Sequence, residues 1–192
     1  MNIKLVVGLG NPGVEYDKTR HNAGAWFVES LLASTSSSLR AEKKFFGQYG
    51  QLTTANHLFH VLIPTTFMNH SGQALLAISQ FFKITPEEML VAHDELDLPV
   101  GVARLKKNGG HGGHNGLRDI IRCLGTQDFL RLRIGIGHPG DKRHVLDYVL
   151  GRPSISDGQK IHQAISDASF AMPFLLKGDV EGAMQYLHAI DK

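Results

Sequence analysis

The feature that most limits the fold of this chain is the alternation of strand-like and helix-like segments along its first 150 residues. Short runs rich in Val, Ile and Leu, or runs of alternating apolar and polar residues, are typical of β-strands, whereas apolar residues three or four positions apart predict helices. Strand patterns cover 2–9, 47–54, 57–64, 89–96, 102–107 and 129–137, and helix patterns cover 22–34, 71–84, 115–125 and roughly 142–150. Further helices follow, ending with one near 179–189. This order predicts the α/β class, with helices on both faces of a central mixed sheet that includes a hairpin at 47–64.

Size and composition predict one soluble domain. A chain of 192 residues is within the range that a single core can fill, so we expect one domain over residues 1–192. The longest apolar stretches fall well short of the ~20 residues of a membrane span, and the N-terminal apolar run is too short for a signal peptide. Cys123 is the only cysteine, so no internal disulfide is possible, which fits a cytoplasmic location. The net charge of +2 does not by itself indicate a nucleic-acid binder, so an anionic partner would need a local basic patch.

The stretch "GLGNPG" at residues 8–13 has the glycine spacing of a dinucleotide-binding turn. In such a turn a helix starts at the last glycine and holds the pyrophosphate, but here the helical pattern starts only near Asn22. We therefore interpret Gly8, Gly10 and Gly13 as residues that shape the backbone of a ligand-binding loop. His21 in this loop could act as a general base, the alternative being a capping or surface histidine.

Three more polar segments adjoin predicted strands or helices: "PTTFMNHSG" (64–72), "VAHDELDLPVG" (91–101) and "NGGHGGHNG" (108–116). In the first, Asn69 is a candidate ligand group, although it or Ser71 could simply cap the following helix. In the second, Asp94 could orient a histidine from another loop, the alternative being a solvated acidic turn. The dense glycines of the third indicate a close backbone approach or mobility near a ligand.

Metal binding and phosphate binding are two further hypotheses. Zinc accepts ligands of the types that His93, Asp94, His111 and His114 offer, but a histidine pair on a glycine loop lacks the rigidity of a helical pair, so we disfavour a metal site. Basic residues share a face on two predicted strands, and if these strands are neighbours they form a basic patch suited to a phosphate backbone. Taken singly, each could be a solvated charge. These residues are Arg104, Lys106, Arg131 and Arg133, with Arg118 and Arg122 on the polar side of the 115–125 helix.

Together, the segments "GLGNPGVEYDKTRHNAG", "PTTFMNHSG", "HDELDLPVG", "GGHGGHNGLRDI" and "RLRIGIGHPG" resemble the bacterial-type peptidyl-tRNA hydrolase family in order and spacing. The resemblance implies a single three-layer α/β/α domain with a mixed, mostly parallel sheet, usually monomeric. It implies a cytoplasmic esterase that frees tRNA from a stalled peptide, with no cofactor or metal. The expected partner is peptidyl-tRNA, bound through its acceptor stem and CCA end, with no membrane and no obligate protein partner.

The resemblance also assigns roles to individual residues. His21 matches the base that deprotonates the attacking water, and Asp94 matches the residue that holds its ring. Asn11 matches the residue that distinguishes N-blocked peptidyl-tRNA from free aminoacyl-tRNA. The substrate-contacting positions correspond to Tyr16, Phe67, Asn69 and Asn115, and the positions near tRNA phosphates to Arg104, Lys106, Arg133 and the adjacent His114. The chain departs from the family at His70, where an apolar residue is usual.

Two other functions stay open at this level. One is an RNA- or nucleotide-binding module without catalysis, and the other is a metal-dependent hydrolase. An oriented histidine base favours the esterase over the binding module, because a protein that only binds has no use for such a base.

Overall fold

The computed structural model describes residues 1–190, and residues 191–192 of the predicted single domain lie outside that range. A central sheet of seven strands has the order β2-β3-β4-β1-β5-β7-β6. The strands are β1 (Leu5–Gly8), β2 (Arg40–Glu42), β3 (Gly47–Thr54), β4 (His57–Pro64), β5 (Met89–Glu95), β6 (Ala103–Lys107) and β7 (Leu130–Gly135). The sheet is mixed, as predicted.

Parallel pairing is confined to the centre of the sheet. β4, β1, β5 and β7 pair in parallel, whereas β2–β3, β3–β4 and β6–β7 are antiparallel. The expected predominance of parallel pairing therefore holds for the four central strands, and the edges are antiparallel. The predicted hairpin at 47–64 is confirmed as β3 and β4.

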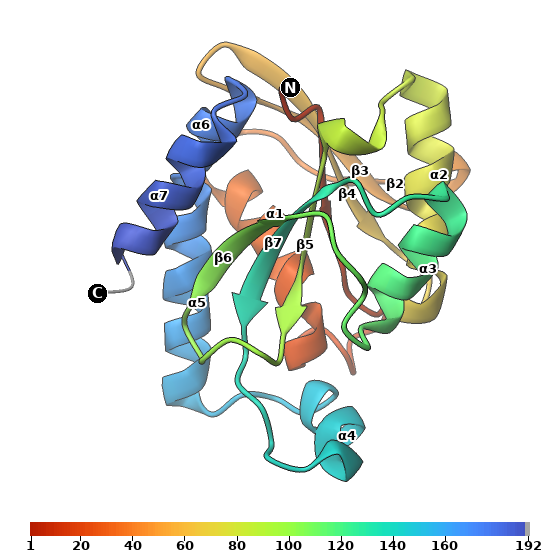
Figure 1. Cartoon of the computed structure of the whole chain (residues 1–192). Helices are drawn as coiled ribbons and strands as arrows, with labels where there is room; N and C mark the ends of the chain where they lie inside the picture. The colour runs from red at the N-terminus through yellow and green to blue at the C-terminus, as the bar shows by residue number, and fades with distance from the viewer. Residues whose placement is uncertain (191–192) are drawn as a thin grey trace.

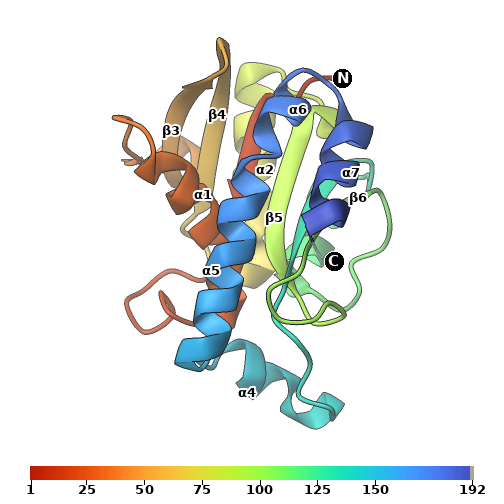
Figure 2. The same ribbon diagram turned by 90° about the vertical axis from the view of Figure 1, so that its left-hand side faces the viewer.

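Helices cover both faces of the sheet, which confirms the three-layer α/β/α arrangement (Figure 1). On one face lie α1 (Ala23–Ala33), α5 (Ile155–Ser169), α6 (Met172–Leu176) and α7 (Val180–Ile190), with α1 and α5 in front of the sheet in Figure 2. On the other face lie α2 (Ser71–Phe82) and α3 (Asn115–Leu124). The short helix α4 (Val145–Val149) projects at the end of the molecule toward which the arrowheads of β5 and β7 point (Figure 1).

The central strands are apolar on both faces because both faces are covered. Along β1, Val6 packs into the core beneath α1 and α5, whereas Leu5 and Val7 pack into the core beneath α2 and α3. All three side chains are fully buried. A strand buried on both faces has a continuous apolar run as its sequence, which is why the sequence predicts β1.

Single-turn 3₁₀ helices connect several of these elements: η1 (Arg20–Asn22), η2 (Lys43–Phe45), η3 (Met68–His70), η4 (Pro86–Glu88) and η5 (Lys142–His144). In η4 the Thr85 backbone N–H donates to the Glu88 carboxylate over 3.0 Å, and Pro86 occupies the first position of the turn. The helix expected near 142–150 is instead η5 followed by the five residues of α4. Within residues 1–190, no helix is both long and apolar enough to cross a membrane.

Candidate active site

His21 and Asp94 meet at the end of the sheet where the parallel strands β1 and β5 finish. His21 lies in η1, just before α1, and Asp94 lies near the end of β5. α1 can approach these strands only because two glycines lack a side chain: a Cβ on Gly24 would lie 2.1 Å from the Ala92 carbonyl oxygen, and one on Gly8 would lie 2.3 Å from the Gly24 carbonyl oxygen. The opening glycines therefore shape the backbone around a site, in keeping with the interpretation from sequence.

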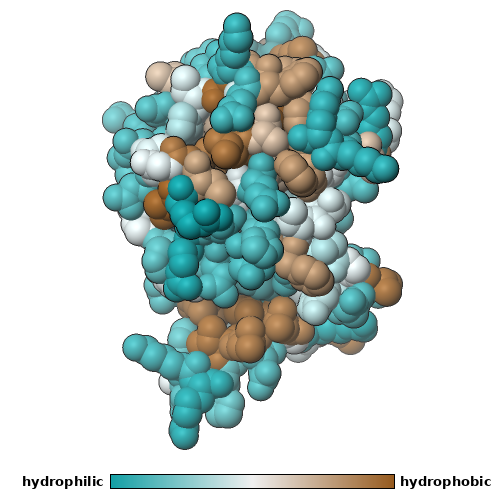
Figure 3. All heavy atoms as spheres, turned by 90° about the vertical axis from the view of Figure 1, so that its right-hand side faces the viewer, coloured by the Kyte–Doolittle hydropathy of each residue, from teal (hydrophilic) through white to brown (hydrophobic). Residues whose placement is uncertain are grey.

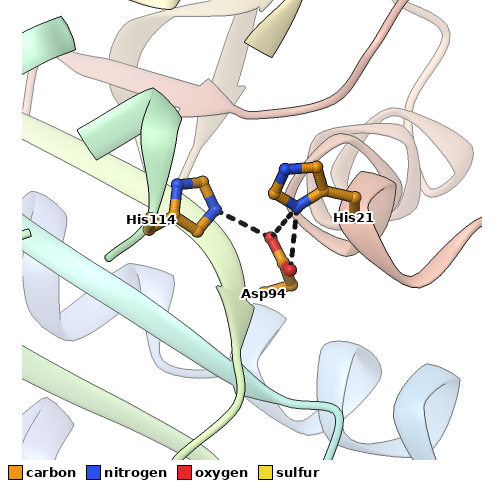
Figure 4. A group of neighbouring side chains, drawn as sticks. All are labelled: His21, Asp94 and His114. Carbon is orange, nitrogen blue, oxygen red and sulfur yellow. Dashed lines mark hydrogen bonds and ion pairs between the residues drawn. The ribbon is translucent and has the colours of Figure 1, made fainter. Parts of the chain in front are cut away.

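The Asp94 carboxylate holds two imidazole rings (Figure 4). His21 Nδ1 lies 3.0 Å from Oδ1 and 2.9 Å from Oδ2, and His114 Nε2 lies 2.8 Å from Oδ1. The Asp94 side chain is 2% exposed, so these rings take the place of water as its donors. The other nitrogen of His21, Nε2, points away from Asp94 in Figure 4 and is the atom that can accept a proton.

Both nitrogens of His114 are in use, which fixes where its proton lies. His114 is the N-cap residue of α3, and its Nδ1 accepts hydrogen bonds from the backbone N–H groups of Gly116 (3.1 Å) and Leu117 (3.3 Å). The proton must then be on Nε2, from which it is donated to Asp94. With both ring nitrogens engaged, His114 would have to give up one of these hydrogen bonds to bind a tRNA phosphate, so its contact with phosphate stays a prediction.

The close contact between Asp94 and His21 shifts the pKa values of both residues. Burial raises the pKa of Asp94, but the electrostatic attraction and hydrogen bonds of the His21 and His114 rings outweigh burial and hold it well below its usual range. Burial lowers the pKa of His21, but the charge of Asp94 and the hydrogen bond to it reverse the sign, so the pKa lies above the ordinary 6.5. Asp94 therefore stays ionised while His21 is a stronger base than a free imidazole.

The same three residues have their ligand atoms within 4.8 Å of one another, which is the spacing of a metal site. Their hydrogen bonds argue against this use. The proton of His114 occupies Nε2, the nitrogen that faces Asp94, because Nδ1 is committed to the α3 backbone. A metal ion between the rings would have to displace that proton, and a neutral ring would then carry its proton on Nδ1 and could no longer accept the hydrogen bonds of the α3 backbone. The donor set thus fits a hydrogen-bonded group better than a metal centre.

His93 was considered from sequence only as a metal ligand, and the structure gives it another place. Its ring is buried, its Nδ1 donates to the Asp94 carbonyl oxygen over 2.7 Å, and its ring centroid lies 5.1 Å from that of His114. Burial, and then the proximity of His114, lower the pKa of His93 to about 3. His93 is thus a neutral packing partner behind the site.

Asn11 joins the opening loop to the loop before α2. Its Oδ1 accepts from the Met68 backbone N–H (2.7 Å), and its backbone exchanges two hydrogen bonds with the Asn22 side chain (2.9 and 3.0 Å). The Asn11 carbonyl oxygen and side-chain oxygen are therefore used internally, so its side-chain NH₂ is the group that can donate to a substrate.

Among the remaining predicted substrate contacts, Tyr16 is partly buried and the others are exposed. The rings of Tyr16 and Phe67 meet edge-on with centroids 6.2 Å apart, and Phe67 is 54% exposed. Asn69 and Asn115 are exposed, and Asn115 Oδ1 accepts from Arg118 over 3.2 Å.

Neither Asn69 nor Ser71 caps α2 with its side chain, so the structural alternative for these residues is wrong. The N-cap position is His70, which makes no side-chain capping bond. The free N–H of Gly72 instead donates to the buried carboxylate of Asp119 in α3 over 2.8 Å. A long-range bond of this kind leaves no local signal in the sequence.

The two basic strands are neighbours, as the basic-patch hypothesis required. β6 pairs with β7 so that Arg104 is opposite Arg133 and Lys106 opposite Arg131. Arg131, however, is 2% exposed, and its guanidinium donates to the carbonyl oxygens of Gly109 and Gly110. Arg131 therefore anchors the glycine loop (108–116) and does not contribute to the exposed basic patch.

The other basic residues differ in how they are held. Arg133 Nε donates to Glu95 over 3.0 Å, and Arg104 Nη1 donates to its neighbouring carbonyl oxygen, that of Ala103, over 3.3 Å. Lys106 is exposed. Arg122 pairs with Asp119 at 2.5 Å on the polar side of α3.

A cavity of about 660 Å³ extends from the His21–Asp94 pair to these basic residues. Glycine-loop residues 110–113 line it, together with charged side chains on one side and apolar side chains of α4 on another. The basic residues are Lys106, Arg131, Arg133 and Lys142, the acidic ones are Asp94, Glu95 and Asp97, and the α4 residues are Val145, Leu146 and Val149. Figure 3 shows the α2 and α3 side of the molecule, with an apolar area at its lower end beside a projecting hydrophilic corner.

Comparisons with known proteins agree with this geometry. The family model described as peptidyl-tRNA hydrolase matches residues 5–192. The chain is 53% identical over 191 residues to a peptidyl-tRNA hydrolase of Chromohalobacter salexigens, covering 99% of this chain and 98% of that protein. It is 56% identical over 190 residues to one of Colwellia psychrerythraea, covering 98% of each. The crystal structure of peptidyl-tRNA hydrolase from Acinetobacter baumannii superposes with a TM-score of 0.94 at 48% identity, covering 97% of this chain and 94% of that one. The chain therefore belongs to the peptidyl-tRNA hydrolase family.

Proposed function

We propose that this protein hydrolyses the ester bond of peptidyl-tRNA, releasing tRNA and peptide, with His21 as general base. The observation that carries the proposal is the bond from His21 Nδ1 to the ionised, buried Asp94, which leaves His21 Nε2 free on the side away from the carboxylate. Family membership supplies the substrate class, and the oriented base supplies a means of cleavage.

The proposed reaction has two proton transfers. A water molecule loses a proton to His21 Nε2 while its oxygen attacks the ester carbonyl carbon. The resulting tetrahedral intermediate then collapses, the bond from carbon to the ribose oxygen breaks, and the leaving oxygen takes the proton back from Nε2. Asp94 stabilises the imidazolium that forms between these steps, and the Nε2–H of His114 keeps the Asp94 carboxylate in place.

The groups proposed to bind the peptide and the CCA end are the residues predicted for that role. The side-chain amides of Asn11, Asn69 and Asn115 can bind a peptide backbone without reading its side chains, as a hydrolase for many peptides requires. The edge-on pair of Tyr16 and Phe67 offers an aromatic surface on which an unpaired base can stack.

Phosphates of the acceptor stem are proposed to bind Lys106, Arg133 and Arg104, independent of base sequence. Lys106 is exposed and lines the cavity, so it can take a phosphate directly. Arg133 must share its guanidinium with Glu95. We further propose that the protein acts as a monomer in the cytoplasm, without an obligate protein partner.

The proposal is tested by cleavage of an N-blocked aminoacyl-tRNA by the wild type, by His21→Ala and by His188→Ala, an exposed histidine of α7 that serves as the matched control. We expect His21→Ala to lose turnover by a factor of about 10³ or more while tRNA affinity is retained, because the lost group acts only in the chemical step. Near-normal turnover in His21→Ala would contradict the proposal. Wild-type protein that binds tRNA without cleaving it would favour the binding module instead.

A further inference from the structure

Arg20 stands next to His21 in η1 and reaches a segment far along the chain. Its Nη1 donates to the Tyr148 carbonyl oxygen over 3.0 Å, and its Cζ lies 4.0 Å from the centroid of the Tyr148 ring. Its backbone N–H donates to the Gly151 carbonyl oxygen over 3.0 Å. A guanidinium above an aromatic face is attracted by the partial negative charge of that face. Arg20 therefore contacts Tyr148 in two ways, through its ring and through its backbone carbonyl oxygen.

Tyr148 is also tied to the sheet. Its hydroxyl donates to the carbonyl oxygen of Ile136, just beyond the end of β7, over 2.6 Å. Two glycines leave room for these contacts: a Cβ on Gly151 would lie 3.1 Å from Arg20 Nη1, and one on Gly137 would lie 3.2 Å from the Tyr148 hydroxyl oxygen. Tyr148 thus joins three parts of the chain, namely η1, α4 and the end of β7.

These contacts stabilise α4, which is too short to be a stable helix without them. α4 has five residues, and a helix of one turn or so is not stable in water without tertiary contacts. It projects from the body of the molecule (Figure 1), and Leu146 is 64% exposed. Yet Val145, Leu146 and Val149 line the cavity that contains His21 and Asp94.

We propose that Arg20 and Tyr148 form a latch that fixes α4 as a wall of the substrate cavity, so that Arg20 is a positioning residue for substrate binding. This inference rests on the proposed function, since the cavity is lined by His21 and Asp94, the residues proposed to cleave the ester. The contacts of the latch are made to Tyr148 and Gly151, and the hydrogen bonds of His21 are made to Asp94, so the two sets of contacts share no side chain. Loss of the latch therefore moves the wall and leaves the base in place.

Steady-state cleavage by Arg20→Met and Tyr148→Leu gives the first test, with Lys18→Met as the matched control. Lys18 is an exposed cation in the same loop, so its removal reproduces the change in charge. We expect each latch variant to raise KM by about fivefold or more with kcat within about twofold of the wild type, and Lys18→Met to change neither. The double variant should raise KM by less than the product of the two single effects, because both substitutions remove the contact between the guanidinium and the ring.

Amide hydrogen exchange gives a second reading that needs no activity. In Arg20→Met, amides in 145–151 should exchange about tenfold faster or more, while those of β1 and β5 keep wild-type rates. Where Arg20→Met fails to fold, Tyr148→Leu carries the test, since it removes the ring that the Arg20 guanidinium contacts and should speed exchange and raise KM in the same direction. An unchanged KM with unchanged exchange would overturn the latch, and so would a fall in kcat at constant KM, which would place the effect on His21. Failure of the wild type to cleave peptidyl-tRNA would instead contradict the proposed function and leave the exchange test of the latch intact.

Discussion

His114 caps helix α3 with one ring nitrogen and donates to Asp94 with the other, 2.8 Å from Oδ1. This arrangement links the position of a helix to the orientation of a buried carboxylate. The same carboxylate holds His21, so a residue predicted to lie near tRNA phosphates belongs to the centre of the site.

The two bonds of His114 can be separated by substitution. His114→Ala removes both, so we expect the free energy of unfolding to fall by about 1–2 kcal/mol and kcat to fall by about tenfold or more. Asn is also a good N-cap residue but is too short to replace the ring at Asp94. His114→Asn should therefore recover most of the stability and little of the activity, as measured by urea unfolding and by cleavage assays. Full activity in His114→Asn would show that the bond to Asp94 is dispensable.

The raised pKa of His21 predicts the pH dependence of the reaction. A general base must be unprotonated, so kcat/KM should fall on the acid side with an apparent pKa above 6.5. A pH–rate profile measured on the free enzyme at low substrate checks this. An acid limb centred below 6.5 would be incompatible with a His21 held by ionised Asp94.

The same shift affects stability with a definite sign. Because the folded pKa of His21 is raised, its ion pair with Asp94 contributes stability that is fully present below pH 6.5 and is lost as the pH rises through the folded pKa. The difference in free energy of unfolding between wild type and His21→Ala should accordingly shrink from pH 6 to pH 8, on a scale set by the roughly 1.4 kcal/mol of each pKa unit. A difference that grows over this range would reverse the assigned direction of the shift.

Lys106 offers a test of phosphate binding with a neighbour as control. Lys106→Ala should raise KM for tRNA substrates and reduce the slope of log KM against log salt by up to about one, because one phosphate contact is lost. Lys107→Ala removes the same charge from the opposite face of β6, away from the cavity, and should leave both quantities near wild type. Equal effects of the two substitutions would show that the net charge of the protein, and not a specific contact of Lys106 with phosphate, determines KM.

Removal of metal ions is expected to leave activity unchanged. The proton of His114 occupies the nitrogen that faces Asp94, and Nδ1 of His21 faces the same carboxylate, so the three residues are satisfied by their own hydrogen bonds. Cleavage rates before and after dialysis against EDTA test this expectation. A loss of activity that zinc restores would support the metal-dependent hydrolase.

Much of this arrangement was predictable because it depends on local patterns. The apolar run of β1 and the periodicity of α2 and α3 gave these elements with small errors at their ends. The three residues of β2 and the five of α4 are too short to show a period, and contacts with the rest of the chain decide their form.

At the site, sequence patterns identified the residue types but not which of them would pair. His21 and Asp94 are 73 positions apart in the sequence. Their pairing was predicted from the resemblance to the family, because no local pattern connects them. Arg131 alternates with Arg133 as an exposed pair would, yet it is buried because the glycine loop folds back over it and accepts its hydrogen bonds. The proton of His114 depends on its ring capping α3, and a helical pattern that starts at residue 115 does not show which side chain forms that cap.

The proposed catalysis requires Asp94 to orient His21, and the strongest test is single-turnover cleavage of an N-blocked aminoacyl-tRNA by Asp94→Asn. We predict a rate about 10²–10⁴-fold below that of wild type with tRNA affinity within about threefold, because an amide cannot hold the His21 tautomer or stabilise its protonated form. A rate within tenfold of wild type in the folded variant would contradict the account.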